Sequence, residues 1–325
     1  MISIKEMADI PVKLTEGHRL CAGCAEPIIA KQVLLGTDKP VVVSNATGCF
    51  EVSTSGYPYN AWNVPWIHSA FENAAATISG VESAYRVLKR KGKIKDDIRF
   101  VTFAGDGATY DIGFQALSGA IERGHQFLFV CFNNEAYMNT GIQRSSATSL
   151  GAATTTCPSG SCIPGKRELP KDITKIIAAH DIPFAAQASP HNWKDLIEKS
   201  AKGFEANGPA FLNVISPCPR GWRHESAMTI EIAKLAVETC MWPLYEFENG
   251  KWKLTGETKR IAEGTKEKRP IQDWIKSQGR FKHLLDPQWK TVADTVQENV
   301  DKKWEELMKL SKQRELPSHP FLYFK

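Results

Sequence analysis

Two turns in the middle of the chain carry side chains that suit a bound cation. Residues 100–104 form an apolar run that stops at the sequence GDG, and residues 127–132 form another that stops at NN. These turns supply the carboxylate of Asp106 and the amide oxygen of Asn134. Mg²⁺ takes a few such protein oxygens and completes its octahedron with water and substrate phosphates. The alternative is an ordinary strand-end turn, in which Gly, Asp and Asn are common.

The residues between these turns predict the elements that would position them. Residues 112–121 have apolar and small side chains at helical spacing, and Gly124 is a typical C-cap. Two strands joined by one helix are almost always parallel, through a right-handed crossover. Their carboxyl ends then lie on the same edge of the sheet, where open α/β folds bind ligands. We therefore expect Asp106 and Asn134 to converge on one point.

Four further cysteines could converge in the same way. Cys21 and Cys24 form a C-x-x-C pair, whereas Cys49 and Cys218 each follow a short apolar run. Four thiolates are the number that a [4Fe–4S] cluster needs, and the proline after Cys218 is typical of such ligation. Zinc and merely buried thiols are the alternatives that spacing alone leaves open.

The remaining cysteines have different surroundings. Cys131 lies inside a predicted strand and Cys240 in an apolar helical stretch, so both are expected in the core. Cys157 and Cys162 lie in an irregular segment, residues 139–165, and are expected to be free thiols. A loop of this length in a compact domain is usually functional. Since no export signal is evident, the cysteines do not indicate a disulfide framework.

Composition indicates a globular protein of one or two domains. The chain has 325 residues, of which 42% are hydrophobic and 24% charged. No apolar run has the length of a membrane span, and a cytoplasmic location is the default expectation. The net charge of +5 is not gathered in one block, so it favours neither nucleic acid nor a membrane as partner.

The order of predicted elements divides the chain into two parts. Residues 1–240 alternate between strands and helices and predict an α/β domain with about six strands. Residues 241–325 are highly charged, with an amphipathic helix at 286–310, and are expected to pack on that domain or on a partner subunit. Residues 56–72 are predicted to be an aromatic loop, which is either a surface loop pinned by its own side chains or a segment that covers a cofactor or contacts a partner. The basic segment 89–95 is either a solvated turn or a docking patch for an acidic partner.

Several motifs in one order suggest a family. These are GHRLCAGCAEP, NATGCFEV, YPYNAWNVPWIHSAFENAAA, FAGDGATYDIGFQALSGAIERG, NNEAYMNTGIQRS and SPCPRGW. Over nearly its full length the chain resembles the β subunit of the multi-subunit pyruvate:ferredoxin oxidoreductases, in which GDG and NN bind thiamine diphosphate. The resemblance implies a doubly wound, mostly parallel α/β sheet with a [4Fe–4S]-binding N-terminal segment and a charged helical C-terminal extension.

The resemblance also implies a role for individual residues. Asp106, the Asn134 side chain and the Ala136 carbonyl would bind Mg²⁺, and Cys21, Cys24, Cys49 and Cys218 would hold one [4Fe–4S] cluster. Asn139 would lie beside the reactive carbon of the cofactor. The expected cofactor contacts are Glu26, Thr47, Gly48, Cys49, Gly105, Asp106, Gly107, Asn134, Ala136, Asn139 and Thr140.

The implied activity is oxidative decarboxylation of pyruvate with coenzyme A to acetyl-CoA and CO₂, with electrons passing through the cluster to ferredoxin. The partners would be α, γ and δ-type subunits, one of which supplies a glutamate that this chain lacks. Alternative substrates are oxalate, a branched-chain oxoacid or 2-oxoglutarate. A thiamine enzyme without redox chemistry would not need the cysteines, and a pure electron-transfer subunit would not need the Mg²⁺ motif. Ala25 replaces the usual Gly, and the cysteines of the 139–165 loop are unexpected for the family.

Overall fold

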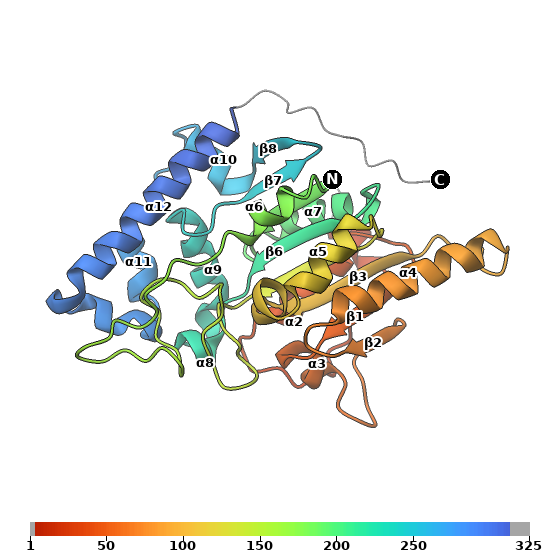
Figure 1. Ribbon diagram of the computed structural model, residues 1–325, viewed down its shortest axis with the longest axis horizontal. Coiled ribbons are helices and arrows are strands. Elements are labelled where there is room, and N and C mark those ends of the chain that lie inside the picture. Colours follow the sequence, from red (N-terminus) through yellow and green to blue (C-terminus); the bar gives the residue numbers. More distant parts are fainter. Residues whose placement is uncertain (1–3, 313–325) are drawn as a thin grey trace.

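The computed structural model describes residues 4–312. Its centre is an eight-stranded sheet with the order β2-β1-β3-β4-β6-β5-β7-β8 (Figure 1). The strands β1 to β6 run parallel to one another, and β7 and β8 are antiparallel additions at one edge. The strands are β1 Val41–Ala46, β2 Trp66–Ser69, β3 Arg99–Gly105, β4 Leu128–Asn133, β5 Phe184–Ala188, β6 Ala210–Ile215, β7 Tyr245–Glu248 and β8 Lys251–Leu254.

Helices connect these strands and continue beyond them. The α-helices are α1 Ile4–Ala8, α2 Glu26–Leu34, α3 Cys49–Thr54, α4 Ala74–Arg90, α5 Phe114–Glu122, α6 Ile173–Ala178, α7 Trp193–Glu205, α8 Pro219–Trp222, α9 Thr229–Glu238, α10 Gly256–Ala262, α11 Ile271–Lys276 and α12 Lys290–Leu310. A π-helical turn, η1 Gly107–Asp111, and three 3₁₀ turns, η2 Ser226–Met228, η3 Gly279–Leu285 and η4 Pro287–Trp289, complete the set. No helix among residues 4–312 combines the length and the apolar character needed to cross a membrane.

Both faces of the sheet are covered, as the doubly wound prediction requires. On one face, α2 and α7 pack on inward side chains such as Val101 and Phe103. On the other face, α4, α5 and α6 pack on Phe100, Phe129 and Cys131. The strands are buried on both faces because crossover helices lie on each side, and this explains their nearly continuous apolar sequences. The predicted mostly parallel α/β fold is confirmed.

The strand order places a crevice at the carboxyl edge of the sheet. After β1 the chain moves outward to β2, and it then returns to β3 on the other side of β1. The connections that leave β1 and β3 therefore diverge, and open α/β sheets bind ligands where this happens.

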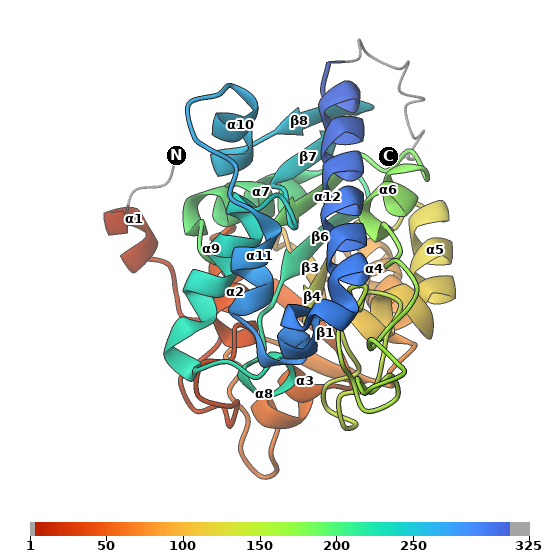
Figure 2. The same cartoon turned by 90° about the vertical axis from the view of Figure 1, so that its left-hand side faces the viewer.

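The C-terminal part contributes to the sheet as well as to a separate hydrophobic cluster. Strand β7 pairs with β5 and β8 pairs with β7. Helices α9, α11 and α12 enclose a cluster that includes Trp222 and Trp274 (Figure 2). Strands β7 and β8 and helix α3 were not predicted, and β2 lies within residues 56–72, for which a loop was predicted. Residues 313–325 of the predicted extension lie outside the described residues, and the division after residue 240 stays a prediction.

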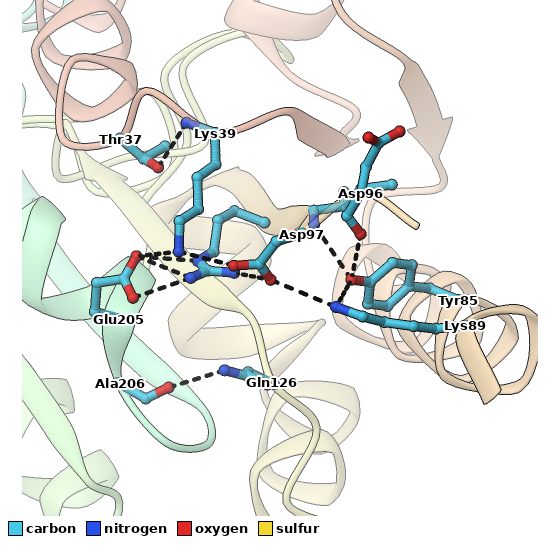
Figure 3. A network of polar contacts seen from close by, with 11 residues as sticks. Thr37, Lys39, Tyr85, Lys89, Asp96, Asp97, Gln126, Glu205 and Ala206 are labelled. Atoms are coloured by element: carbon cyan, nitrogen blue, oxygen red, sulfur yellow. Dashed lines mark hydrogen bonds and ion pairs between the residues drawn. The ribbon is translucent and has the colours of Figure 1, made fainter. Parts of the chain in front are cut away.

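The opposite, amino-terminal edge of the sheet is held by a network of charged side chains (Figure 3). Arg99, at the start of β3, donates to Glu205 at the end of α7 and to Asp97. Lys39 contacts both of these carboxylates. Hydrogen bonds from Arg99 and Lys39 hold the pKa of Asp97 well below its usual range. Charged side chains thus join β1, β3 and α7 at the end of the molecule that lies away from the crevice.

Candidate functional site

A cleft opens at the carboxyl edge of β1, β3 and β4. It brings together most of the residues expected to contact the cofactor: Glu26, Thr47, Gly48, Cys49, Gly105, Gly107, Asn134, Ala136 and Asn139. Asp106 lies behind this lining and is fully buried. Thr140 is exposed and does not line the cleft; its hydroxyl bonds to Gln143 instead.

Asp106 lies where β3 ends and the π-helical turn begins. Its Oδ2 atom accepts a 2.5 Å hydrogen bond from the Ser145 hydroxyl. Its Oδ1 atom is buried and has no hydrogen-bond partner among the described residues. Burial raises the pKa of Asp106 to about 8, because the charged carboxylate loses its water. A cation bound at Oδ1 would take the place of the lost water and favour the charged Asp106 carboxylate.

Asn134 follows β4 and is oriented by two contacts. Its Nδ2 group donates to Glu26 Oε1 over 3.2 Å, and its backbone carbonyl accepts from Trp222 Nε1 over 2.7 Å. Its Oδ1 atom, like that of Asp106, is buried without a partner in the described part of the chain. Buried polar atoms are nearly always hydrogen-bonded. Two oxygen atoms of the kind that Mg²⁺ prefers are therefore left without protein partners at two adjacent strand ends.

Tyr137 and Phe71 form an aromatic side of the cleft. Their rings stack with centroids 5.6 Å apart. A Cβ atom at Gly107 would lie 2.4 Å from the Tyr137 ring, so only glycine permits this approach. The Tyr137 ring is therefore a local reason for glycine at position 107.

Glu26 is the one carboxylate among the described residues that line the cleft. It is 4% exposed, and burial raises its pKa to about 7. One carboxylate oxygen accepts from Asn134, and the other has no partner within residues 4–312.

The four cysteines predicted to bind a cluster approach one another from three loops. Cys21 and Cys24 precede α2, Cys49 is the first residue of α3, and Cys218 is the N-cap of α8. Thr229, shortly after α8, donates to the Gly23 carbonyl, which ties the first loop to the third. Each of Cys24, Cys49 and Cys218 has a pKa that is raised mainly by burial and further by the neighbouring thiols.

The thiols also lie next to the cleft. The charge of Glu26 acts on three of them, Cys24, Cys49 and Cys218, and raises their pKa values. A hydrogen bond from the Asn139 side chain acts in the opposite direction on Cys49. Within residues 4–312, no group of three or more His, Cys, Asp or Glu side chains is close enough to bind a single metal ion.

The other cysteines follow their predicted environments. Cys131 and Cys240 are 0% and 3% exposed, which confirms that they belong to the core. Cys157 is half-buried and Cys162 is exposed, and neither forms a disulfide. These two thiols belong to the long loop after β4, where they lie apart from the strand ends.

Several residues of the site were not predicted from the sequence. Asn45 is buried at the end of β1, lines the cleft, and leaves its Nδ2 group without a partner in the described chain. His68 contacts the Thr47 hydroxyl over 2.6 Å. Ser145, Glu135 and Arg280 lie behind the lining. Asn45 had a local signal, because it stands one residue before the end of a strand, whereas the others depend on contacts between distant segments.

Comparisons with known proteins agree on one family. A model of the thiamine pyrophosphate enzyme C-terminal TPP binding domain matches residues 46–214. The chain is 49% identical over 321 residues to pyruvate synthase subunit PorB of Thermotoga maritima, covering 95% of this chain and 96% of the relative. It is 48% identical to the PorB subunit of Methanocaldococcus jannaschii, over 88% of this chain and 93% of the relative.

Two further proteins are similar to the chain. Ketoisovalerate oxidoreductase subunit VorB of Pyrococcus furiosus is 40% identical over 311 residues, which cover 95% of this chain and 97% of the relative. A solved structure of 2-oxoglutarate:ferredoxin oxidoreductase from Magnetococcus marinus matches 68% of this chain and 79% of its own, with a TM-score of 0.53 and 20% identity. The similarity to this structure concerns the fold.

Proposed function

We propose that this chain is the β subunit of a pyruvate:ferredoxin oxidoreductase. It belongs to the PorB family of pyruvate synthase subunits, within the thiamine pyrophosphate enzymes. In the proposed reaction pyruvate and coenzyme A give acetyl-CoA and CO₂, and two electrons pass to ferredoxin. The observation that carries the proposal is the pair of buried, unpartnered oxygens on Asp106 and Asn134 beside four converging thiols. This combination suits a diphosphate-bound cation next to a redox cluster.

The residues present fit thiamine diphosphate and Mg²⁺. Asp106 Oδ1 and Asn134 Oδ1 would bind the cation together with the Ala136 carbonyl. Gly48, Gly105 and Gly107 line the cleft and would let the backbone approach the diphosphate. Thiamine diphosphate, when bound, supplies the stabilised carbanion that decarboxylation of a 2-oxoacid needs.

The thiols of Cys21, Cys24, Cys49 and Cys218 would hold the [4Fe–4S] cluster. Thiolates are the usual cluster ligands, and burial raises the pKa values of three of these thiols, Cys24, Cys49 and Cys218. Positive iron at these positions would favour the thiolate form.

The side chains of the cleft would orient the reactants. Asn139 lines the cleft and reaches Cys49, so its amide can donate to a substrate oxygen between the cofactor and the cluster. Glu26 holds the Asn134 amide so that Oδ1 is the free atom. Thr47, hydrogen-bonded to His68 over 2.6 Å, closes the side formed by β1.

The cleft is expected to be completed by another subunit. Glu26 already binds Asn134 and lies deep in the site, so a separate glutamate for the pyrimidine ring would come from an α-type chain, with γ and δ-type subunits and ferredoxin as further partners. The loop between α3 and β2 projects from the body of the molecule in both views (Figures 1 and 2). Its Tyr57 and Tyr59 are 94% and 73% exposed. Exposed tyrosines of this kind are typical contact residues at interfaces.

The experiment is a 2-oxoacid panel on the intact complex, purified without oxygen. We expect pyruvate to reduce ferredoxin in a coenzyme A-dependent reaction, and 3-methyl-2-oxobutanoate and 2-oxoglutarate to be poor substrates. In the complex with Asp106→Ala, calorimetry should detect no Mg²⁺-dependent binding of thiamine diphosphate. If 3-methyl-2-oxobutanoate were turned over faster than pyruvate, the proposed substrate would change from pyruvate to a branched-chain oxoacid, as the name of the VorB relative suggests. Wild-type cofactor affinity in Asp106→Ala would remove the Mg²⁺ assignment.

A further inference from the structure

Glu135 stands between Asn134 and Ala136, two of the proposed Mg²⁺ ligands, and it has an unfavourable backbone conformation. Glu135 has a φ of 62°, in the left-handed region that side chains other than glycine rarely adopt. Such a conformation persists only where surrounding contacts determine it. Since Asn134 and Ala136 flank Glu135, whatever fixes Glu135 also fixes the direction of the Asn134 amide and the Ala136 carbonyl.

A buried ion pair fixes the side chain of Glu135. Arg280 Nη1 lies 2.9 Å from Glu135 Oε2, and the two side chains are 2% and 3% exposed. The Ser149 N–H also donates to Oε2, and the Thr148 hydroxyl donates to the Glu135 carbonyl over 2.7 Å. Removing one member of such a pair leaves an uncompensated buried charge, so the remaining carboxylate would have to turn away or be protonated.

Arg280 acts on the neighbouring residue by a second route. Its guanidinium lies 3.9 Å from the centre of the Trp222 ring. The indole Nε1 of Trp222 donates to the Asn134 carbonyl over 2.7 Å. Trp222 ends α8, the short helix that begins just after Cys218. The stacking contact therefore connects Arg280 to the proposed Mg²⁺ turn and to the proposed cluster loop.

Arg280 is itself oriented through its Nε, Nη1 and carbonyl groups, whereas its buried Nη2 group has no partner in the described part of the chain. Its Nε donates to Gln278 Oε1 over 2.8 Å, and its carbonyl accepts from the Ala153 N–H over 3.0 Å. It belongs to η3 in the C-terminal part of the chain, among the aromatic rings of the third hydrophobic cluster. The planar guanidinium can stack and donate at the same time, which a lysine ammonium cannot do.

We propose that Arg280 is a positioning residue that holds the Asn134–Glu135–Ala136 turn in the geometry required to bind Mg²⁺ with thiamine diphosphate. The inference rests on the proposed function, because it assumes a cation at this turn. It assigns to the C-terminal part of the chain a direct role in the cofactor site. Arg280 does not line the cleft, and it acts through Glu135 and Trp222.

The test measures the Mg²⁺ requirement for thiamine diphosphate binding in the intact complex after removal of the cofactor. Mg²⁺ is titrated at a fixed thiamine diphosphate concentration, and binding is followed by tryptophan fluorescence and calorimetry. Loss of a residue that orients metal ligands lowers metal affinity by roughly 10–100-fold, so Arg280→Met should raise the half-saturating Mg²⁺ concentration by at least about tenfold. Arg280→Lys keeps the charge but not the stacking, and should give an intermediate value.

The matched control is Lys199→Met. Lys199 and Asp195 form another buried ion pair, 2.6 Å apart with side chains 1% and 9% exposed, on α7. This variant should lose thermal stability as Arg280→Met does, yet retain the wild-type Mg²⁺ requirement. The inference would be overturned if Arg280→Lys had the same Mg²⁺ requirement as the wild type and Lys199→Met. This comparison remains decisive if Arg280→Met fails to assemble. Absence of Mg²⁺-dependent binding in the wild type would instead refute the proposed function.

Discussion

Single residues in the cleft carry polar atoms that the folded chain does not satisfy. Asp106 Oδ1, Asn134 Oδ1 and Glu26 Oε2 are all buried without partners in the described structure. An unsatisfied buried polar atom costs about 1–3 kcal/mol, so several of them together destabilise the protein without its ligands. A cation bound by Asp106 Oδ1 and Asn134 Oδ1 would remove the share of this cost that comes from these two oxygens, because it supplies their missing partner.

The cysteines provide a residue-scale prediction with internal controls. Replacing Cys21, Cys24, Cys49 or Cys218 by Ser should lower the iron content of the chain well below the roughly four atoms of one cluster, because each thiolate binds one corner. Cys157→Ser and Cys162→Ser should retain wild-type iron and the visible absorbance of the cluster. Iron loss in Cys157→Ser together with normal iron in Cys218→Ser would show that the fourth ligand has been assigned to the wrong loop.

At the scale of elements, the π-helical turn after β3 decides how closely the turn at Asp106 and the turn at Asn134 approach, the two turns that we propose bind the cofactor. Gly107 begins this turn, and the Tyr137 hydroxyl, from the segment after β4, donates to its carbonyl over 3.3 Å. Since the ring of Tyr137 occupies the space next to Gly107, the two strand ends are coupled through one aromatic contact. A side chain at residue 107 would push that ring into the cleft.

We therefore expect Gly107→Ala and Gly80→Ala to have opposite effects. The added methyl group at residue 107 overpacks the site, which costs about 1–3 kcal/mol of stability, and the displaced ring should weaken thiamine diphosphate binding. Gly80 is an exposed position within α4, where an added Cβ would meet no atom within 4 Å, and alanine there should stabilise the helix by up to about 1 kcal/mol. Thermal denaturation and calorimetry of both variants test this. Equal cofactor affinity in the two variants would contradict the proposed role of Gly107.

At the scale of the whole molecule, we propose that another subunit completes the cofactor site. The cleft is formed by three strand ends, and Glu26, its one carboxylate among the described lining residues, is already hydrogen-bonded to Asn134. The tyrosines of the projecting loop lie in solvent next to α3, which begins at Cys49. A chain with these features is expected to work only when another subunit covers the cleft.

The isolated chain should accordingly be inactive. After anaerobic reconstitution with cluster, Mg²⁺ and thiamine diphosphate, we expect no measurable release of CO₂ from pyruvate, whereas addition of the remaining subunits should restore it. The intact complex, reconstituted in parallel, controls for damage to the cluster. Full turnover by the isolated chain would refute the need for a partner and would indicate that Glu26 serves the pyrimidine ring.

The sequence by itself determined the elements that depend on local patterns. Apolar runs that end in Gly, Asp or Asn predicted where β3 and β4 stop, and their parallel pairing placed Asp106 and Asn134 at one edge. The convergence of Cys49 and Cys218 near the same edge followed from the same rule, because both come after parallel strands. The strand ends themselves are confirmed, because strand ends are marked by neighbouring residues, whereas the ligand roles of these residues stay predictions.

Only the tertiary structure decided the features that depend on distant partners. Strand β2 has half-exposed residues within an aromatic loop, and it becomes a strand because β1 pairs with it. Strands β7 and β8 are short and charged, and they form by adding to the edge of β5. Strand propensity depends strongly on such context. Likewise, the contact of Arg280 with Glu135 joins segments far apart in the chain, and no local pattern of residue types encodes a pairing over that distance.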